Sequence, residues 1–412
     1  MFTERAGEGQ NMEKAIRVLH VLGGVSLGGA ESRIMDLYRQ MNREEIQFDF
    51  LVHASAVKRG FQEMRRIADG SEKQNEKGDG CVRKPEFYDE EIQAMGGHIY
   101  VLPKFKVYNY FSYRKAVKKF FAAHREFQVV QGHMTSTAGI YLPIARRAGV
   151  PVVVAHARNA GVVKGLKGLA TRFFRRGLAK KADYCFACSV LAGQDVFGEA
   201  AMKSGQVKVI YNAIDVGRFT YDEKVRQEAR ARLGIAGALV LGHVGRFEYQ
   251  KNHPYLLEVF AAVCEKRKDA VLLLLGDGED RTAMEEKCRQ LGIAERVYFL
   301  GNQKDAWRYY QAMDIFLLPS FFEGLPGVLV EAQAAGLRCM VSDTVTREAK
   351  ATDLVTYLSI EETPRRWAEE ILRQADYARR DTSKELQEAG SDVRTQAQGY
   401  RRSYLTGDSS QI

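Results

Sequence analysis

The sequence of 412 residues contains little cysteine and no hydrophobic stretch of membrane-spanning length. Six cysteines in a chain of this size are typical of a reducing compartment, where disulfides do not hold the fold together. The longest run of valine and leucine, Val271–Leu275, is far shorter than the ~20 apolar residues that a membrane-spanning helix needs. The residues before Met12 lack the apolar core of a secretory signal, so we expect a cytoplasmic protein that starts at Met1 or Met12.

Other signatures are missing as well, and each absence excludes a class of protein. No short tandem repeat is present, which excludes solenoids and propellers. With 45% apolar residues, the composition is that of a globular chain and not of a disordered or fibrous one.

The net charge of +9 indicates anionic partners such as phosphates or an anionic membrane surface. The charge is dispersed and no recognition module accompanies it, so we expect no nucleic-acid partner.

Short apolar runs, typical of buried strands, alternate with segments of helical length and spacing. This alternation predicts an α/β protein with right-handed crossovers and mostly parallel sheets. The expected strands are Ile16–Leu22, Phe48–Val52, Val129–Gln131, Pro151–Ala155, Tyr184–Ala187, Ala238–Val244, Ala270–Leu275, Val297–Leu300, Ile315–Leu318 and Cys339–Ser342. The expected helices are Ala30–Met41, Tyr113–His124, Ala138–Ala148, Lys167–Lys180, His253–Glu265, Arg281–Leu291, Asp305–Ala312, Gly327–Ala335, Pro364–Tyr377 and Lys384–Ala389.

The length and the restart of this pattern in the second half predict two domains. We expect a first Rossmann-like domain over residues 13–208, a second over residues 209–391 and a final segment over residues 392–412. Residues 56–85 are expected to form a solvated, flexible insertion, because Gly70–Gly80 contains no apolar residue. Two α/β halves predict a cleft between them, with ligands beyond the carboxyl ends of the strands.

The most informative motif is PSFFEGLPGVLVEA, Pro319–Ala332, which follows an expected strand and opens an expected helix. Pro326 suits the first turn of a helix, and the free backbone amides there can bind an anion. Glu331 lies one turn in and leans back toward the helix start, while Glu323 reaches the same place from the loop. Two carboxylates repel a phosphate, so hydroxyls of a ribose and a sugar ring are their expected partners. The alternative is a pair of surface glutamates that flank a helix start.

A second motif places two cations after an expected strand. The strand ends near Gly245, and Arg246 and Lys251 follow it. A guanidinium fork suits paired phosphate oxygens and an ammonium group supplies a point charge, so these residues are candidate phosphate ligands. The alternative is a pair of solvated charges in a loop.

A third motif is the glycine-rich loop Gly23–Glu31 after the first expected strand. Gly24, Gly28 and Gly29 permit close approach of the backbone to a ligand. The loop lacks the G-x-G-x-x-G spacing, so it gives only a weak dinucleotide signal.

Two histidines stand at the carboxyl ends of expected strands. His133 follows one strand, and His156 follows the next and is itself followed by Arg158 and Asn159. Both histidines would face the predicted cleft, although a histidine is also a common structural residue. Asp277, between two glycines, is interpreted as part of a turn and a helix cap rather than of a metal site, and we expect no metal.

The segment Lys164–Lys181 carries seven basic residues and no acidic one, with leucine and phenylalanine at helical spacing. Such a basic amphipathic helix can lie on an anionic lipid surface. The alternative is a packing helix with a basic, solvated face.

Together these motifs resemble glycosyltransferase family 4, whose members are retaining enzymes with the GT-B fold. Glu323 and Glu331, eight residues apart, are similar to the two-glutamate signature of that family. Three further features follow in the same order as in the family: the loop that carries Arg246 and Lys251, the turn Gly276–Gly278, and Gly301. The sequence is most similar to bacterial capsule and exopolysaccharide enzymes.

The resemblance implies a GT-B protein, with two Rossmann-like parallel-sheet domains that face a central cleft, and a segment after Asp392 that crosses back onto the first domain. It implies a nucleotide-sugar donor, favoured as a UDP-sugar, and no separate cofactor. The implied donor-binding residues are Gly24, Gly28, Gly29, Gly245, Arg246, Lys251, Gly301, Glu323, Gly324, Leu325, Pro326, Gly327 and Glu331. The implied catalytic residues are His156, Glu323, Arg246 and Lys251, and the acceptor-side residues are His133, Arg158 and Asn159.

The sequence therefore predicts a metal-independent, retaining glycosyltransferase that moves a sugar from a nucleoside-diphosphate sugar to a glycan or lipid-linked acceptor in cell-surface polysaccharide synthesis. We expect it at the inner face of a membrane. The alternatives are a sugar-nucleotide epimerase or hydrolase on the same scaffold, which needs no acceptor, and a sugar-nucleotide-binding protein without turnover.

Overall fold

The computed structural model describes residues 15–54, 83–158, 166–408 and 412. The chain divides into two compact units, of which the first comprises residues 1–210 and 397–412 and the second residues 211–396. Each unit is built on one parallel sheet, so the predicted α/β class with two parallel-sheet domains is confirmed. Residues 56–82 of the predicted insertion, 56–85, lie outside the described residues.

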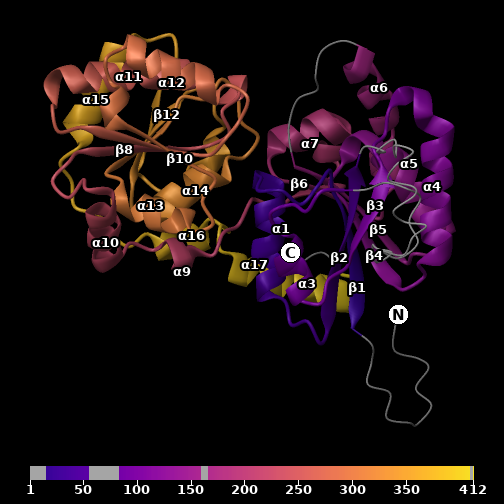
Figure 1. Ribbon diagram of the computed structural model, residues 1–412. Coiled ribbons are helices and arrows are strands. Elements are labelled where there is room, and N and C mark those ends of the chain that lie inside the picture. The colour runs from indigo at the N-terminus through magenta and orange to yellow at the C-terminus, as the bar shows by residue number, and fades with distance from the viewer. Residues whose placement is uncertain (1–14, 55–82, 159–165, 409–411) are drawn as a thin grey trace, which may run out of the picture. The chain divides into compact units, whose positions relative to one another are not determined.

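Within the described residues, the first unit contains a sheet of seven parallel strands (Figure 1). The strands are β1 (Ile16–Val21), β2 (Ile46–Ala54), β3 (Ile99–Pro103), β4 (Phe127–Gly132), β5 (Val152–Ala157), β6 (Tyr184–Ala187) and β7 (Val207–Val209). Their order is β3-β2-β1-β4-β5-β6-β7. The helices are α1 (Gly29–Gln40), α3 (Asp89–Ala94), α4 (Tyr110–Ala123), α5 (Thr135–Arg147), α6 (Leu166–Arg175), α7 (Val190–Phe197), α8 (Glu199–Lys203) and, from Ala397 onward, α17 (Val393–Thr406).

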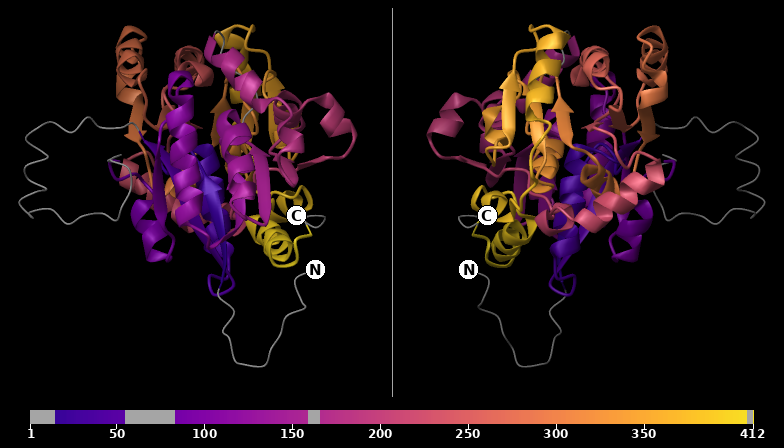
Figure 2. Two further views of the ribbon diagram at one scale, coloured as in Figure 1. Left: turned by 90° about the vertical axis from the view of Figure 1, so that its right-hand side faces the viewer. Right: turned by 90° about the vertical axis from the view of Figure 1, so that its left-hand side faces the viewer.

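Helices cover both faces of the first sheet (Figure 2). Phe48 of β2 stacks on Tyr38 of α1 with ring centroids 4.9 Å apart, and Tyr404 of α17 meets the same ring edge-on at 6.1 Å. His53 of β2 hydrogen bonds through Nε2 to the hydroxyl of Tyr113 in α4, at 2.9 Å. Positions 48 and 53 of a strand point to opposite faces. Helices α1 and α17 therefore cover one face, and α4 with its neighbour α5 covers the other.

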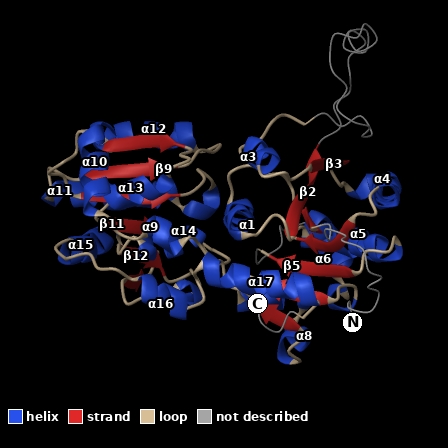
Figure 3. Cartoon of the chain, turned by 90° about the horizontal axis from the view of Figure 1, so that it is seen from below, coloured by secondary structure: helices blue, strands red, loops and turns tan. Residues whose placement is uncertain are grey.

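The second unit contains a sheet of six parallel strands within the described residues (Figure 3). The strands are β8 (Val240–Val244), β9 (Val271–Leu275), β10 (Val297–Gly301), β11 (Ile315–Leu318), β12 (Arg338–Ser342) and β13 (Val355–Leu358). Their order is β10-β9-β8-β11-β12-β13. The helices are α9 (Val216–Phe219), α10 (Glu223–Leu233), α11 (His253–Lys266), α12 (Arg281–Gln290), α13 (Ala306–Ala312), α14 (Gly327–Ala334), α15 (Pro364–Gln374) and α16 (Ser383–Glu388).

The core of the second unit follows from its apolar strands, which are buried on both faces as in other parallel sheets. Leu272 and Leu317 pack with Phe260 of α11 and Trp367 of α15 in one buried cluster, to which α12 also contributes. On the other face, Tyr310 of α13 lies against the sheet, and α14 packs beside it (Figure 1). Because helices pack on both faces, the strands are held in place, and so are the starting points of the loops at the carboxyl end of the sheet.

The structure corrects several details of the predicted elements. The expected helix Lys167–Lys180 is interrupted, because Gly177 adopts a left-handed conformation with φ of +65° and ends α6 before a short 3-10 turn, Leu178–Lys180. Strands β3, β7 and β13 were not expected. They lie at sheet edges and are short or half-exposed, so they lack the continuous apolar run of a central strand.

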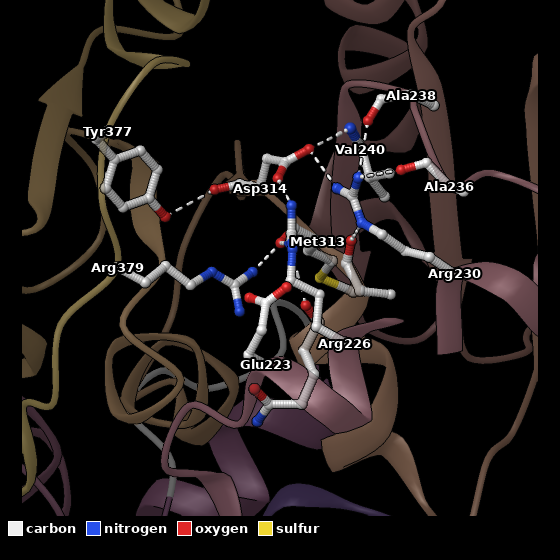
Figure 4. A network of polar contacts seen from close by, with 12 residues as sticks. Glu223, Arg226, Arg230, Ala236, Ala238, Val240, Met313, Asp314, Tyr377 and Arg379 are labelled. Atoms are coloured by element: carbon white, nitrogen blue, oxygen red, sulfur yellow. Dashed lines mark hydrogen bonds and ion pairs between the residues drawn. The ribbon is translucent and has the colours of Figure 1, made fainter. Parts of the chain in front are cut away.

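A polar network ties α10 and α13 to the amino end of the second sheet (Figure 4). The carboxylate of Asp314, which precedes β11, accepts hydrogen bonds from Arg226 at 2.5 Å and from Arg230 at 2.6 Å. Arg226 and Arg379 also donate to the carbonyl oxygen of Met313, just beyond the end of α13. The positive side chains suit this end of the helix, where backbone carbonyls lack helical partners.

Candidate functional site

The loops after β8, β9 and β10 pack backbone to backbone at the carboxyl end of the second sheet. Gly245 donates its backbone N–H to Leu275, and Gly276 donates to Gly301, both at 2.9 Å. Gly276 has φ of +128°, and a Cβ atom on it would lie 2.0 Å from the carbonyl oxygen of Gly245. Only glycine fits there. The predicted residues Gly245 and Gly301 therefore lie on one rim at the carboxyl end of this sheet, both half-buried.

Lys251 and Glu323 form an ion pair on this rim. Their Nζ and Oε1 atoms are 2.7 Å apart, and the side chains are only 12% and 7% exposed. Gln250 donates its side-chain amide to the other carboxylate oxygen at 3.0 Å, and its carbonyl accepts from the backbone of Phe321 at 2.9 Å. The structure therefore brings Glu323 and Lys251 together, and Glu323 holds the ammonium group in place.

Arg246 differs from Lys251 in its environment. It follows Gly245 at the end of β8 and is exposed. Among the described residues, no hydrogen bond or ion pair of its guanidinium group is present. Arg246 therefore offers its full charge and all of its donors at the carboxyl end of the sheet.

The start of α14 lies in the loop predicted to bind an anion. The helix begins at Gly327 with Pro326 as N-cap residue, whereas the sequence placed Pro326 inside the first turn. Asn212, itself buried, donates its side-chain amide to the carbonyl of Leu325 at 2.8 Å and anchors the loop. Gly324 lies in the same loop, half-buried.

Glu331 lies in α14 one turn beyond this start and is buried. The hydroxyl of Tyr310 donates to its Oε2 atom at 2.8 Å. Tyr310 is fully buried against Phe316 of β11, so its hydroxyl is held rigidly. A carboxylate has room for about four hydrogen bonds, so the bond from Tyr310 does not by itself fill the acceptor capacity of Glu331.

The glycine loop of the first unit contacts a residue that the sequence did not single out. The carboxylate of Glu86 accepts a hydrogen bond from the backbone N–H of Val25. A Cβ atom on Gly24 would lie 2.7 Å from that carboxylate. Gly28 is the N-cap residue of α1, and the space beside Gly29 is open. Glu86 therefore lies on the part of the loop that carries Gly24.

A cluster of histidines lies at the carboxyl end of the first sheet. Nδ1 of His20 in β1 is 3.0 Å from Nε2 of His133, and the rings of His133 and His156 are 5.4 Å apart. Arg158 donates through Nε to Nδ1 of His133 at 3.2 Å. The structure thus brings together His133, His156 and Arg158, while Asn159 lies outside the described residues.

The histidines of this cluster are neutral. Burial lowers the pKa of His20 to about 3 and, together with the charge of Arg158, lowers the pKa of His133 and His156 well below the ordinary value. Among the described residues, Nε2 of His156 has no hydrogen-bond partner. Nδ1 of His156 is 3.1 Å from the side-chain amide nitrogen of Gln131.

Asp277 takes part in a turn, as predicted, since its carboxylate accepts from the backbone of Gly278 at 2.9 Å. The expectation that it caps the following helix is wrong, because Asp280 is the N-cap residue of α12. In the part of the chain that the structure describes, no group of three or more histidine, cysteine or acidic side chains could hold a metal ion.

Sequence reasoning missed several partners of the predicted residues. Gln131 and His20 are polar residues within apolar strands, which is a weak signal of a buried site. Tyr310, Gln250 and Asn212 gave no signal at all, because their contacts join segments that are distant in the sequence.

Comparison with known families and proteins agrees with this geometry. Residues 27–218 match the family described as Glycosyltransferase Family 4, and residues 225–389 match Glycosyl transferases group 1. A putative glycosyltransferase, EpsF of Bacillus subtilis (strain 168), is 36% identical over 364 residues, which cover 87% of this chain and 88% of EpsF.

Two further comparisons cover both units. CapH of Staphylococcus aureus, a capsular polysaccharide biosynthesis glycosyltransferase, is 24% identical over 367 residues, covering 86% of this chain and 90% of CapH. A crystal structure of HepE from Anabaena in complex with UDP and glucose is 16% identical, with a TM-score of 0.66, and covers 93% of this chain and 94% of that one. The fold of this chain is thus that of the GT-B glycosyltransferases, as predicted.

Proposed function

The chain belongs to glycosyltransferase family 4, and from that premise we propose that it transfers a sugar, with retention of configuration, from a nucleoside-diphosphate sugar to a glycan or lipid-linked acceptor. The likeness to EpsF and to the capsular enzyme CapH supports a role in cell-surface polysaccharide synthesis. HepE was crystallised with UDP, which supports a UDP-sugar as donor.

The observation that carries the proposal is the arrangement of charge at the carboxyl end of the second sheet. Glu323 compensates the charge of Lys251, which it contacts at 2.7 Å, whereas Arg246 has no such partner among the described residues. Arg246, Lys251 and the amide groups at the start of α14 are proposed to bind the diphosphate. They stabilise the negative charge that grows on the leaving group, so no metal is needed for that purpose.

The carboxylates have a different proposed role. Glu331, oriented by the hydroxyl of Tyr310, accepts hydrogen bonds from the ribose hydroxyls of the donor. Glu323 and the loop to Gly327 bind the transferred sugar. A carboxylate suits hydroxyl donors and repels phosphate, which separates the sugar and ribose contacts from the diphosphate contacts.

In the first unit, His156 is proposed to contact the reacting sugar, and His133 and Arg158 to lie on the acceptor side. His156 is neutral because burial and the charge of Arg158 lower its pKa well below the ordinary value. A neutral ring serves as a hydrogen-bond donor or acceptor and not as a strong acid. The glycine loop with Gly24, whose backbone contacts Glu86, is proposed to approach the donor.

We propose further that the first unit docks on an anionic membrane. Among the described residues, no helix combines the length and apolar character needed to cross one. Five apolar side chains around α6 and the start of α4 are 58–82% exposed, and we call them the apolar patch. They are Val107, Tyr108, Phe111, Leu169 and Phe173.

The two segments that carry the apolar patch are neighbours, because Phe174 of α6 contacts Tyr110 of α4 with ring centroids 5.9 Å apart. Arg172 of α6 and Arg114, Lys115 and Lys118 of α4 belong to the same two helices, and Lys164 lies outside the described residues. Arg175 is less available for contact with anionic lipid than the sequence predicts, because its guanidinium group forms an ion pair with Asp195 at 2.9 Å. Apolar side chains within basic surroundings fit the interface of an anionic bilayer.

The experiment is an assay of nucleoside-diphosphate release from candidate donors, with and without lipid-linked or glycan acceptors. The proposal predicts release that depends on an acceptor. Release without an acceptor would indicate a hydrolase, interconversion of the donor would indicate an epimerase, and binding of UDP without release from any donor would indicate a binding protein.

A further inference from the structure

We propose that Gln131 and Tyr404 are positioning residues that determine which ring nitrogen of His156 carries the hydrogen, and that they make Nε2 a hydrogen-bond donor toward the reacting sugar. The inference rests on the role of His156 under the proposed function. It concerns only the first unit, to which all three residues belong.

The three side chains form a continuous chain of hydrogen bonds across β4, β5 and α17. The hydroxyl of Tyr404 donates to Oε1 of Gln131 at 2.6 Å, and Nε2 of Gln131 lies 3.1 Å from Nδ1 of His156. Gln131 is 1% exposed, His156 is fully buried and Tyr404 is 9% exposed. Water therefore has little access to compete for these hydrogen bonds. As a result, the orientation of each side chain depends on the side chain that it contacts.

The direction of the chain follows from the donors and acceptors of each group. Burial raises the pKa of Tyr404 well above its ordinary value, so the phenol keeps its hydrogen and donates it. The amide of Gln131 uses its oxygen for that bond and turns its NH2 group toward His156. An NH2 group donates, so Nδ1 of His156 accepts and has no hydrogen. A neutral imidazole then carries its hydrogen on Nε2.

The Nε2 atom of His156 is the free end of this chain. It is buried and has no hydrogen-bond partner among the described residues. A buried N–H group without a hydrogen-bond partner lowers the stability of the fold. We therefore expect Nε2 of His156 to find its partner in a bound ligand. A hydroxyl or ring oxygen of the sugar fits a neutral N–H donor.

The neighbouring histidines show the same order of hydrogens. Arg158 donates to Nδ1 of His133, so Nε2 of His133 carries the hydrogen and donates to Nδ1 of His20. The groups near His156 are thus the neutral ring of His133 in β4, the ring of Phe186 in β6, the neutral ring of His20 in β1 and the cation of Arg158, which follows β5. None of them offers an acceptor to Nδ1 of His156. Gln131 therefore determines which ring nitrogen of His156 carries the hydrogen.

The test combines NMR with kinetics on the full chain. The ring 15N shifts and couplings of His156 report which nitrogen carries the hydrogen, and we expect Nε2–H in the native protein. Gln131→Glu replaces the NH2 donor by an acceptor, which requires a hydrogen on Nδ1 of His156. We expect this variant to move the hydrogen to Nδ1 or to protonate the ring, and to lower kcat by about 100-fold with a small change in KM.

Tyr404→Phe keeps the ring packing and removes one hydroxyl partner of Gln131, whose side chain also hydrogen bonds to Tyr400, so the orientation of the amide is held less firmly. We expect a mixture of ring tautomers and a fall in kcat of about tenfold. The matched control is Tyr113→Phe, which removes another buried tyrosine hydroxyl of the first unit, one that contacts His53 at 2.9 Å. The control should lower thermal stability by a similar amount and leave kcat and the His156 signals unchanged.

An Nδ1–H tautomer in the native protein, or a native kcat in Gln131→Glu, would overturn the inference. A Tyr404→Phe variant that loses activity only in proportion to Tyr113→Phe would also contradict it. The NMR measurement needs no substrate and therefore tests the inference even when no donor has been identified. A failure to find any donor would count against the proposed function and not against the tautomer of His156.

Discussion

Arg246 and Lys251 are both cations of the proposed diphosphate site, yet their surroundings predict different responses to mutation. Arg246→Ala removes an exposed side chain, so the melting temperature should hardly change while kcat falls by about 100-fold. Lys251→Ala leaves the buried carboxylate of Glu323 without its ion partner. We expect that variant to lose activity and also about 3 kcal/mol of stability.

The measurement is a thermal melt beside steady-state kinetics for each variant. Lys251→Ala combined with Glu323→Gln should recover most of the lost stability but none of the activity, because the carboxylate charge is removed and the ammonium is not restored. Equal loss of stability in Arg246→Ala and Lys251→Ala would contradict this account of the site.

Sequence reasoning placed Arg246, Lys251, Glu323 and Glu331 at the carboxyl end of the second sheet, because loops after parallel strands meet at one edge. It did not find that Glu323 holds Lys251, since charges 72 positions apart give no pairing signal. Tyr404 could not be connected with Gln131, 273 positions away, before the strands and α17 were placed.

At the scale of elements, the network around Asp314 joins α10, α13 and β11 (Figure 4). Asp314→Ala leaves Arg226 and Arg230 without their carboxylate in a part-buried position. We expect a loss of about 2–4 kcal/mol of stability. Asp269→Ala breaks the exposed pair with Arg267 and is the matched control, with an expected loss below about 1 kcal/mol. Chemical unfolding of both variants checks this, and equal losses would contradict it.

The apolar patch makes a second prediction at this scale. Phe111 and Phe173 are 82% and 69% exposed, so replacing both by serine should not destabilise the fold. It should weaken binding to vesicles that contain anionic lipid, measured by co-sedimentation, by at least about tenfold. Leu191→Ser, at 49% exposure in α7, is the control. Unchanged vesicle binding of the double variant would remove this surface from the account.

Central strands were predictable because they are apolar throughout, as in β9, Val271–Leu275. The edge strands β3 and β13 were not predicted because most of their residues are only partly buried and the continuous apolar pattern of a central strand is missing. The break after α6 depends on the left-handed conformation of Gly177, which the sequence permits but does not demand. Element boundaries therefore depend on tertiary contacts more than on the local pattern.

At the scale of the whole molecule, buried histidines predict how stability depends on pH. Burial lowers the pKa of His20 to about 3, of His243 to about 4 and of His253 to about 2. In the unfolded chain these groups take up protons near pH 6.5, which the folded chain does not. The unfolded state therefore binds more protons below that pH, and the free energy of unfolding falls by up to about 1.4 kcal/mol per histidine and pH unit.

Thermal melts from pH 7.5 to pH 5 should show a falling midpoint, with the decline beginning near pH 6.5. A midpoint that stays constant or rises on acidification would show that the buried histidines are protonated in the folded state.

NMR of the product's anomeric centre, in reactions with and without a chelator, tests whether the chain is a retaining glycosyltransferase whose own cations stabilise the leaving diphosphate. We expect a product that keeps the anomeric configuration of the donor sugar, formed at the same rate in both reactions. An inverted product would contradict the proposed mechanism, and activity that is abolished by the chelator and restored by magnesium would contradict the roles of Arg246 and Lys251.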